Sequence, residues 1–527
     1  MTIFPTSDFR LPTSELRSAE ERGCRLSDSD SPDRRWATVA TEAEVLAVAR
    51  TVPSARRLLD VAEAFAGDPR VEIRWAVDPG SELGGGVREL LAARRIRPLR
   101  LKHARRRAWH LVLAASENSP LDRLCAPVLL LPHGAGHGKG MAAERLVRCD
   151  PQAIGLAHAD DAARLASLSP AVGAAARVVG DPCWDRLAAS RHRRAAYREA
   201  LGVGGSRLLV LSSTWGPFSL FHRHTDLAGR LTAALPWDSW RVAMVLHPGV
   251  RARHGDDTVS RWLRPALERG LLLLDTDDEW RAGLVAADAV IGDHGSVTLY
   301  AAALGVPTAF ACFGWEEVDP EATIARLGRR GRYFAADGPL AKQVEELAGE
   351  PGDPALADQV FAHQGTALDR IADVAYELMR LPRPRVEVAP IAVPIPRSAH
   401  AAPTAWWFAA HETGDGIMVD RFPASETVPA GARLLAHVHD ADPRRPAAAT
   451  VVVGTADLTN HPGAYVAVDG TAITLRGFNG VLVAESGLDS ALVAAALHTW
   501  VFQLGREVPR GLRVNGCSVQ LAASPQR

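Results

Sequence analysis

The sequence predicts an α/β protein with two parallel-sheet domains, followed by a smaller α+β module. Short apolar runs alternate with helical segments from Glu44 to about residue 380, which is typical of βαβ units. The clearest unit covers residues 271–312, where three apolar runs are separated by two helical segments and one polar turn. A proline-rich stretch then separates this region from a C-terminal part that has several strand-like runs and one strong helix.

A chain of 527 residues is long enough for about three domains. Residues 1–40 are polar and charged with little periodicity, and they predict a loosely ordered tail. A single long amphipathic helix, expected over 355–380, would pack back across the junction between the two α/β domains. The expected domains are a Rossmann-like domain at 41–190, a second one at 191–380, a proline-rich linker at 381–405 and an accessory α+β module at 406–527.

The composition argues against two classes of function. The 60 basic and 61 acidic residues nearly cancel, whereas a dedicated nucleic-acid binder carries a basic surplus, so no nucleic-acid partner is predicted. No apolar run is long enough to span a membrane. The six cysteines are scattered and form no C-x-x-C pattern, which predicts reduced thiols. We therefore expect a cytoplasmic protein.

One dense basic cluster lies between the third and fourth predicted strands. It has two interpretations: a surface for an anionic membrane or acceptor, or a solvated face in an arginine-rich protein. The first interpretation would place the protein peripherally at the inner face of the cell membrane. The second gains weight because the chain has only three lysines, so abundant arginine does not by itself indicate anion binding. The candidate residues of this surface are Arg97, Arg100, Lys102, Arg105, Arg106 and Arg107.

A glycine-rich loop at 132–140 follows the fifth predicted strand and contains His133, Gly134, His137 and Lys139. Glycine lets a ligand approach the backbone closely, and an imidazole that titrates near neutrality can accept a proton from an attacking hydroxyl. A metal site at His133 and His137 would need a helix to bring both rings to one face, and the glycine content disfavours a helix. We predict a functional loop without a metal; the alternative is a plain glycine-rich turn.

Polar residues recur at the ends of successive strands in the second predicted domain. Ser213 and Thr214 end one strand, His247 and Pro248 end the next, and the segment 293–296 ends a third. The carboxyl ends of parallel strands meet at one edge of a sheet, so these residues predict a shared crevice. Ser296 is expected to cap the following helix, whose N–H groups and dipole favour a diphosphate. The alternative is that Ser296 is only a helix cap.

These segments resemble the motifs of one enzyme family, the CDP-glycerol glycerophosphotransferases of teichoic-acid synthesis. Residues 133–139 resemble its W-H-G-T-P-L-K segment, and 180–185 resemble its G-x-P-x-x-D. Residues 213–215, 246–248 and 293–297 resemble its P-T-W, L-H-P and D-Y-S-S-V segments. The order and spacing match over about residues 44 to 380, and the tail lies outside the resemblance.

The resemblance implies a GT-B arrangement of two Rossmann-like domains, and a reaction in which an acceptor hydroxyl attacks the β-phosphorus of CDP-glycerol and CMP leaves. It implies that His133 is the general base and that His247 stabilises the transferring phosphoryl group. The nucleotide is a substrate, no separate cofactor is expected, and the acceptor would be a polyol-phosphate or lipid-linked chain of the cell envelope. The implied donor-binding residues are Gly134, His137, Lys139, Ser213, Thr214, Pro248, Asp293, Gly295, Ser296 and Tyr300.

Several residues depart from the family pattern. Pro132 replaces a tryptophan, Ala135-Gly136 replaces Thr-Pro, and Gly295 replaces the first serine of a pair. Tyr300 stands where the family carries an aspartate, and nucleotide-sugar relatives place an acid near there to bind ribose hydroxyls. Two alternatives therefore stay open: a nucleotide-sugar glycosyltransferase or 2-epimerase of the same fold, and a catalytically degenerate scaffold used for binding.

Overall fold

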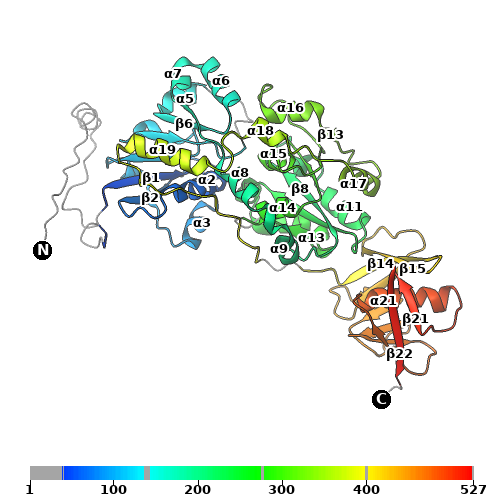
Figure 1. Cartoon of the computed structure of the whole chain (residues 1–527). Helices are drawn as coiled ribbons and strands as arrows, with labels where there is room; N and C mark the ends of the chain where they lie inside the picture. The colour runs from blue at the N-terminus through cyan, green and yellow to red at the C-terminus, as the bar shows by residue number, and fades with distance from the viewer. Residues whose placement is uncertain (1–37, 40, 136–142, 275–277, 398–400, 525–527) are drawn as a thin grey trace.

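The computed structural model describes residues 38–39, 41–135, 143–274, 278–397 and 401–524. Two α/β domains with parallel sheets are followed by a closed β-barrel, and Figure 1 shows the three units in chain order along the molecule. The predicted α/β class is confirmed for the first two units. The predicted tail at 1–40 lies outside the described residues except for 38 and 39.

The first sheet has seven parallel strands in the order β3-β2-β1-β4-β5-β6-β7. The strand order reverses between β1 and β4, and ligands of open α/β sheets bind outside the carboxyl ends at such a point. The strands are β1 (Ala43–Ala49), β2 (Val71–Val77), β3 (Leu99–Arg100), β4 (Leu111–Ala114), β5 (Val128–Leu130), β6 (Ala153–Leu156) and β7 (Ala176–Val178). The helices are α2 (Val52–Ala62), α3 (Val87–Ala93), α4 (Leu101–Ala104), α5 (Ala143–Cys149), α6 (Ala159–Leu168), α7 (Pro170–Ala174), α8 (Pro182–Ala189) and α9 (Arg194–Ala200).

Local sequence explains why α2 begins directly after β1. Strand β1 is almost entirely buried, because helices cover both faces of a parallel sheet, and its apolar run ends at Ala49. Thr51 then caps α2 in a capping box with Ser54, and a proline occupies the first turn. Leu58 and other apolar residues of α2 pack on the sheet. These local signals set the start of α2, and so they set the position of Arg57, whose side chain lies at the domain junction.

The second sheet has six parallel strands in the order β10-β9-β8-β11-β12-β13, with its reversal between β8 and β11. The strands are β8 (Arg207–Ser213), β9 (Trp240–Leu246), β10 (Leu272–Leu273), β11 (Ala289–Gly292), β12 (Thr308–Phe310) and β13 (Arg332–Tyr333). The helices are α10 (Leu220–Arg223), α11 (Leu227–Ala234), α12 (Pro248–His254), α13 (Asp256–Glu268), α14 (Glu279–Ala286), α15 (Ser296–Ala303), α16 (Thr323–Arg330), α17 (Leu340–Ala348), α18 (Leu356–Val360) and α19 (Ala367–Met379).

The expectation of one long helix over 355–380 is wrong, because the chain breaks between α18 and α19. His363 and Gly365 take left-handed backbone conformations in the break, with φ of 51° and 83°. Phe361 is buried there and stacks on Trp184 of the first domain, with ring centroids 4.8 Å apart. Asp185 accepts hydrogen bonds from the Gly365 and Ala367 amides at 2.7 and 2.8 Å, which restarts the helix as α19. Figure 1 shows α19 lying on the first domain, as predicted for a crossing helix.

The proline-rich segment after α19 packs against the α/β domains over its described part, 381–397. Arg383 pairs with Asp369 and Asp373 of α19. Val393 is fully buried; its amide donates to Ser190 Oγ at 2.8 Å, and its carbonyl accepts from the Tyr197 hydroxyl at 2.6 Å. This segment is therefore a bound strap and not a free linker.

The C-terminal module is a closed nine-stranded barrel, whereas the sequence predicted only an α+β module. Helix α21 is buried on all sides, so it belongs to the barrel core. The strands are β14 (Ala405–Thr413), β15 (Gly416–Pro423), β16 (Arg433–His437), β17 (Val451–Val453), β18 (Val466–Asp469), β19 (Ala472–Leu475), β20 (Val481–Glu485), β21 (Gly511–Val514) and β22 (Cys517–Ser524). The helices are α20 (Arg444–Ala448), α21 (Ser490–His498) and the π-helical turn η5 (Thr499–Gln503).

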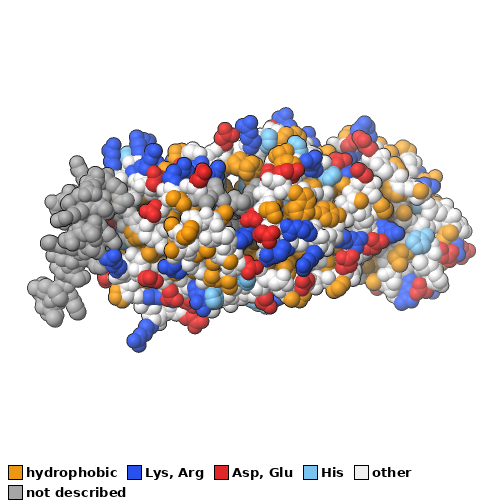
Figure 2. All heavy atoms as spheres, turned by 90° about the horizontal axis from the view of Figure 1, so that it is seen from above, with side chains coloured by type: hydrophobic (Ala, Val, Ile, Leu, Met, Phe, Trp, Pro, Cys, Tyr) orange, Lys and Arg blue, Asp and Glu red, His pale blue; other side chains and the backbone are white. Residues whose placement is uncertain are grey.

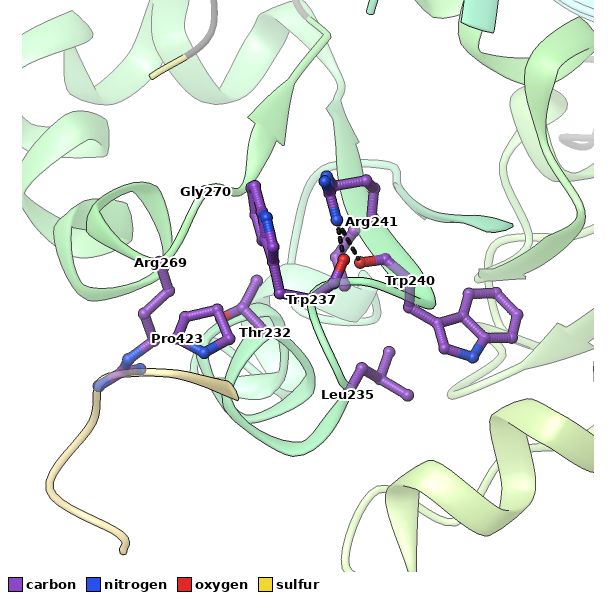
Figure 3. Close-up of a pocket in the computed structure, with 9 residues that line it drawn as sticks. Thr232, Leu235, Trp237, Trp240, Arg241, Arg269, Gly270 and Pro423 are labelled. Carbon is purple, nitrogen blue, oxygen red and sulfur yellow. Dashed lines mark hydrogen bonds between the residues drawn. The ribbon is translucent and has the colours of Figure 1, made fainter. Parts of the chain in front are cut away.

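The barrel is joined to the second α/β domain by a buried arginine. Arg421 of β15 donates two hydrogen bonds to Asp238, at 2.6 and 2.9 Å, and one to Asp489 at the start of α21. Its carbonyl accepts from the Trp237 amide at 2.6 Å. Figure 3 shows the small cavity beside this contact, where the Arg241 guanidinium lies 3.5 Å from the Trp237 ring centroid and Pro423 contributes from the barrel.

Four cysteines, Cys149, Cys183, Cys312 and Cys517, carry free thiols. Cys125 is disulfide-bonded, so the expectation of reduced thiols is wrong for this residue. Within the described ranges, no helix is both long enough and apolar enough to cross a membrane.

Candidate functional site at the domain junction

Asp293 fastens two strand-end loops of the second domain together. Its carboxylate is fully buried and accepts hydrogen bonds from the amides of Thr214 at 2.8 Å, Leu220 at 2.9 Å and Gly295 at 3.0 Å. Burial raises the pKa of Asp293, although these amides and His294 act in the opposite direction. Asp293 therefore positions the loops after β8 and β11, and its oxygens are already occupied by the backbone.

Helix α15 begins at the end of β11, but its cap differs from the prediction. Gly295 occupies the N-cap position without a side-chain cap, and Ser296 is the first residue of the helix. The expectation that Ser296 caps the helix is wrong, because the backbone is still extended at Gly295 and already helical at Ser296. The amides of Ser296 and Val297 have no intrahelical acceptor at this position in a helix, and the helix dipole makes the region favourable for an anion.

The glycine-rich loop of the first domain meets α15 of the second domain. A Cβ atom added to Gly134 would lie 2.3 Å from Ser296 Oγ and 3.2 Å from Ser296 Cβ, so Gly134 and Ser296 are in close contact. A Cβ atom added to Gly295 would lie 3.4 Å from Thr214 Cβ. The structure thus brings together segments 133–134, 213–214 and 293–296, which come from different parts of the sequence and from both domains.

The Nδ1 atoms of His133 and His247 play opposite roles in their hydrogen bonds. His133 Nδ1 lies 2.9 Å from the carbonyl oxygen of Ala115, which can only accept, so Nδ1 carries a proton. His247 Nδ1 accepts from the Gly249 amide at 3.0 Å, so Nε2 carries the proton. The first ring is suited to accept a proton and the second to donate a hydrogen bond.

Sequence reasoning missed a contact between His294 and Glu317. His294 Nδ1 accepts from the Gly314 amide at 3.1 Å, and Nε2 lies 3.3 Å from Glu317 Oε2. This contact ties the loop after β12 to the loop after β11. Trp215 and Trp315, from the loops after β8 and β12, are 39% and 44% exposed, so the second domain presents aromatic surface near these loops. Glu317 could not be identified from the sequence, because it lies outside every recognised motif.

Tyr300 lies in a buried polar cluster that joins the two domains. Arg57 of α2 donates to Asp181 through two bonds of 2.9 Å and to the Tyr300 hydroxyl at 3.1 Å. The Tyr300 hydroxyl donates to Asp181 at 2.9 Å. Burial, followed by the charge of Asp181, raises the pKa of Tyr300 well above its usual value. Burial lowers the pKa of Arg57, but the charge of Asp181 outweighs this effect and the net pKa of Arg57 is raised.

A second ion-pair network lies beside the first. Asp60 of α2 binds Arg281 of α14 at 2.5 Å and Arg186 of α8 at 2.6 Å, and both arginines also bind Asp278. Burial raises the pKa of Asp60, but the two arginines outweigh it and the net pKa is lowered. The first and second domains are therefore held together by buried charges on one side of the junction.

The remaining predicted residues are placed as follows. His137 and Lys139 lie outside the described residues. Ser213 is buried; its hydroxyl donates to the Thr214 carbonyl and accepts from the Phe221 amide, while Pro248 begins α12. Within the described ranges, no group of three or more metal-ligating side chains is assembled. Two cavities formed by the described residues lie elsewhere, one beside Trp237 and one beside α19.

Most of the basic cluster is exposed, and at least one of its residues forms an ion pair. Arg107 binds Glu44 at 2.9 Å and lies over the Trp109 ring, and Arg105 is half-buried. Figure 2 shows basic and acidic side chains interspersed over the face in view. The exposed members of the cluster are Arg97, Arg100, Lys102 and Arg106.

No family model and no curated protein matches the sequence. Among solved structures, the chain is similar to HepE of Anabaena in complex with UDP and glucose, at 14% identity and a TM-score of 0.39, over 64% of this chain and 100% of that one. The wall teichoic acid polymerase TagF matches at 14% identity and 0.42, over 67% and 92%. MnaA of S. aureus with UDP matches at 12% and 0.42, over 64% and 97%. At these low values the likenesses assign no function.

Replacing Arg57 with methionine tests the buried cluster. Arg57→Met leaves the buried Asp181 carboxylate without its cation, so we expect a loss of about 3–5 kcal/mol in the free energy of unfolding. Tyr300→Phe removes only one hydroxyl and should cost about 1–3 kcal/mol. Urea denaturation followed by tryptophan fluorescence measures both values. Arg88→Met, at an exposed position of α3, is the matched control, and equal losses in the Arg57 and Arg88 variants would contradict the assignment.

Proposed function

We propose that this protein is a transferase that moves a glycerophosphate-type group from a CDP-activated donor to a hydroxyl of a cell-envelope acceptor. The acceptor is of the teichoic-acid-like or lipid-linked type. The observation that carries the proposal is the contact between Gly134 and Ser296, which joins the family-like motifs of the two domains at one junction.

The histidine tautomers support the direction of proton transfer in this reaction. His133 Nε2 takes the proton from the acceptor hydroxyl as its oxygen attacks the β-phosphorus of the donor. The bond from this phosphorus to the bridging oxygen breaks, and CMP leaves with the electron pair. His247 donates its Nε2–H to the phosphoryl oxygens, where negative charge is held during transfer.

The start of α15 is proposed as the diphosphate site. The amides of Ser296 and Val297 and the Ser296 hydroxyl would bind phosphate oxygens, and Gly134 and Gly295 would allow the donor to approach the backbone. Asp293 and Tyr300 are left out of the direct donor contacts, because Asp293 is bound by amides and the Tyr300 hydroxyl is bound by Arg57 and Asp181. The proposed donor contacts also include His137, Lys139, Thr214 and Pro248.

Donor binding is tested by calorimetry with CDP-glycerol, a UDP-sugar and a GDP-sugar. We expect CDP-glycerol to bind, and Ser296→Ala to weaken it about tenfold or more, because a hydrogen bond to a charged phosphate is lost. Ser260→Ala, at an exposed position of α13, is the control and should bind as the wild type does. Binding of a UDP-sugar alone would favour a glycosyltransferase or 2-epimerase, and no binding of any nucleotide would favour a degenerate scaffold.

The general base is tested with His133→Gln. Glutamine cannot accept the proton, so turnover should fall by about 10²–10⁴ while donor affinity stays within a few-fold. Steady-state kinetics and calorimetry on the same preparations separate these two quantities. His103→Gln, at an exposed position of α4, is the control. Unchanged turnover in the His133 variant would remove this residue from the mechanism.

We also propose that the exposed basic cluster holds the protein at the anionic inner face of the cell membrane. Sedimentation with anionic liposomes should show binding at low salt that is lost at high salt, because salt screens exposed charges. Reversing Arg100, Lys102 and Arg106 to glutamate should abolish it. Reversing Arg253 and Arg264, which are exposed on the second domain, is the control. Salt-independent binding would rule out an electrostatic anchor.

A further inference from the structure

The end of α21 inside the barrel has an unusual combination of features. The α-helix passes at His498 into the π-helical turn η5, and π-helical turns are often found at functional sites. His498 is 4% exposed and Thr499 is 3% exposed, yet they are polar residues at the end of an otherwise apolar helix. A barrel core that needed only packing would carry apolar residues at both positions.

Two buried polar atoms at this position have no hydrogen-bond partner. They are Nδ1 of His498 and Oγ1 of Thr499. Leaving a buried polar atom unpaired is costly, and such atoms call for an explanation such as a water or a ligand. Two in consecutive residues indicate that partners for them come from outside the chain.

Aromatic rings from three elements surround the imidazole of His498. The rings of Phe408 from β14, Tyr465 before β18 and Phe502 of η5 each have a centroid 5.7 Å from that of His498. Tyr465 is 45% exposed, and its ring lies 5.1 Å from that of Phe502. Tyr465 therefore reaches from the buried His498 ring to the exposed surface of the barrel.

The charge state of the histidine narrows the class of ligand. Burial, and then the charge of Arg433, lower the pKa of His498 to about 4, so the ring is neutral at physiological pH. A neutral imidazole and a hydroxyl suit a neutral ligand with its own hydroxyl groups. The aromatic faces suit a ligand that also has an apolar face. A purely apolar ligand would leave both polar atoms unpaired.

We propose that the barrel binds a sugar ring at this position, with the apolar face of the ring against Tyr465 and Phe502 and its hydroxyls on His498 and Thr499. The Tyr465 side chain turns aside to admit the sugar. The proposal concerns the barrel alone and does not depend on the transfer reaction at the domain junction.

The test is saturation-transfer NMR on the full chain with methyl α-glucoside, N-acetylglucosamine and glycerol. We expect transfer to the ring protons of at least one sugar and little to glycerol, which has no ring face. Tyr465→Ala should weaken sugar binding about tenfold, because an aromatic contact is lost. His498→Phe should abolish it while the melting temperature stays the same or rises, because an unpaired polar group is removed.

The controls make the result specific to the barrel. Tyr333→Ala removes a tyrosine that is 48% exposed on the second α/β domain, and it should leave sugar binding unchanged. If the His498 variant fails to fold, Phe502→Ala is measured in its place, and it should also weaken sugar binding. No transfer to any probe, or transfer that survives Tyr465→Ala undiminished, would overturn the proposal; the latter would place the sugar elsewhere on the chain.

Discussion

The buried ion pair between Arg57 and Asp181 is the interaction on which the arrangement of the two α/β domains depends. Both charges are removed from water, so they are tolerated only because each fully satisfies the other and Tyr300 completes the cluster from the second domain. The same arginine also donates to the Gly134 carbonyl at 3.3 Å. The Arg57 side chain thus contacts the glycine-rich loop, the N-cap residue of α8 in the first domain and Tyr300 of α15 in the second domain.

The buried ion pairs at the domain junction limit how far the candidate site can change shape. A cleft between two domains can open and close, but the buried charges around Arg57 and Asp60 hold one side of this junction together. The strand-end loops on the second domain are fixed to each other as well, through Asp293 and through the His294–Glu317 contact. The amides at the start of α15 are therefore oriented before any ligand arrives, which reduces the cost of binding an anion.

The barrel is attached by the same physical means as the first two domains. Arg421 is buried between Asp238 of the second α/β domain and Asp489 of the barrel. A flexible tether would instead leave the strap exposed, whereas Val393 is fully buried and hydrogen-bonded on both its amide and its carbonyl. The barrel and the strap are parts of one assembled molecule, so a ligand on the barrel would be held at a defined distance from the domain junction.

Particular residues show how far the sequence could go. The apolar runs at β8, β9 and β11 and the polar residues at their ends were readable, because a strand buried on both faces needs an uninterrupted apolar run. The break in the helix near Phe361 could not be predicted. It depends on the ring of Trp184 and on the carboxylate of Asp185, which binds the first amides of α19, and both residues lie about 180 positions earlier in the chain. Tyr300 looked like a ligand contact for the same reason: its partners Arg57 and Asp181 are distant in sequence. Closure of the barrel was also hidden, because alternating strand patterns do not specify which strands pair.

The class of the first two domains, the positions of most of their strands and the polar segments at the strand ends could all be predicted from the order of residues along the chain. Those features follow from local periodicity and turn chemistry, which act between residues close in the chain. Three features became visible only in the folded chain: Gly134 contacts Ser296, the Tyr300 hydroxyl binds Arg57 and Asp181, and the Nδ1 atoms of His133 and His247 play opposite hydrogen-bonding roles. Each of these features is a contact that folding creates between particular atoms. The pattern of neighbouring residues in the sequence does not predict such contacts.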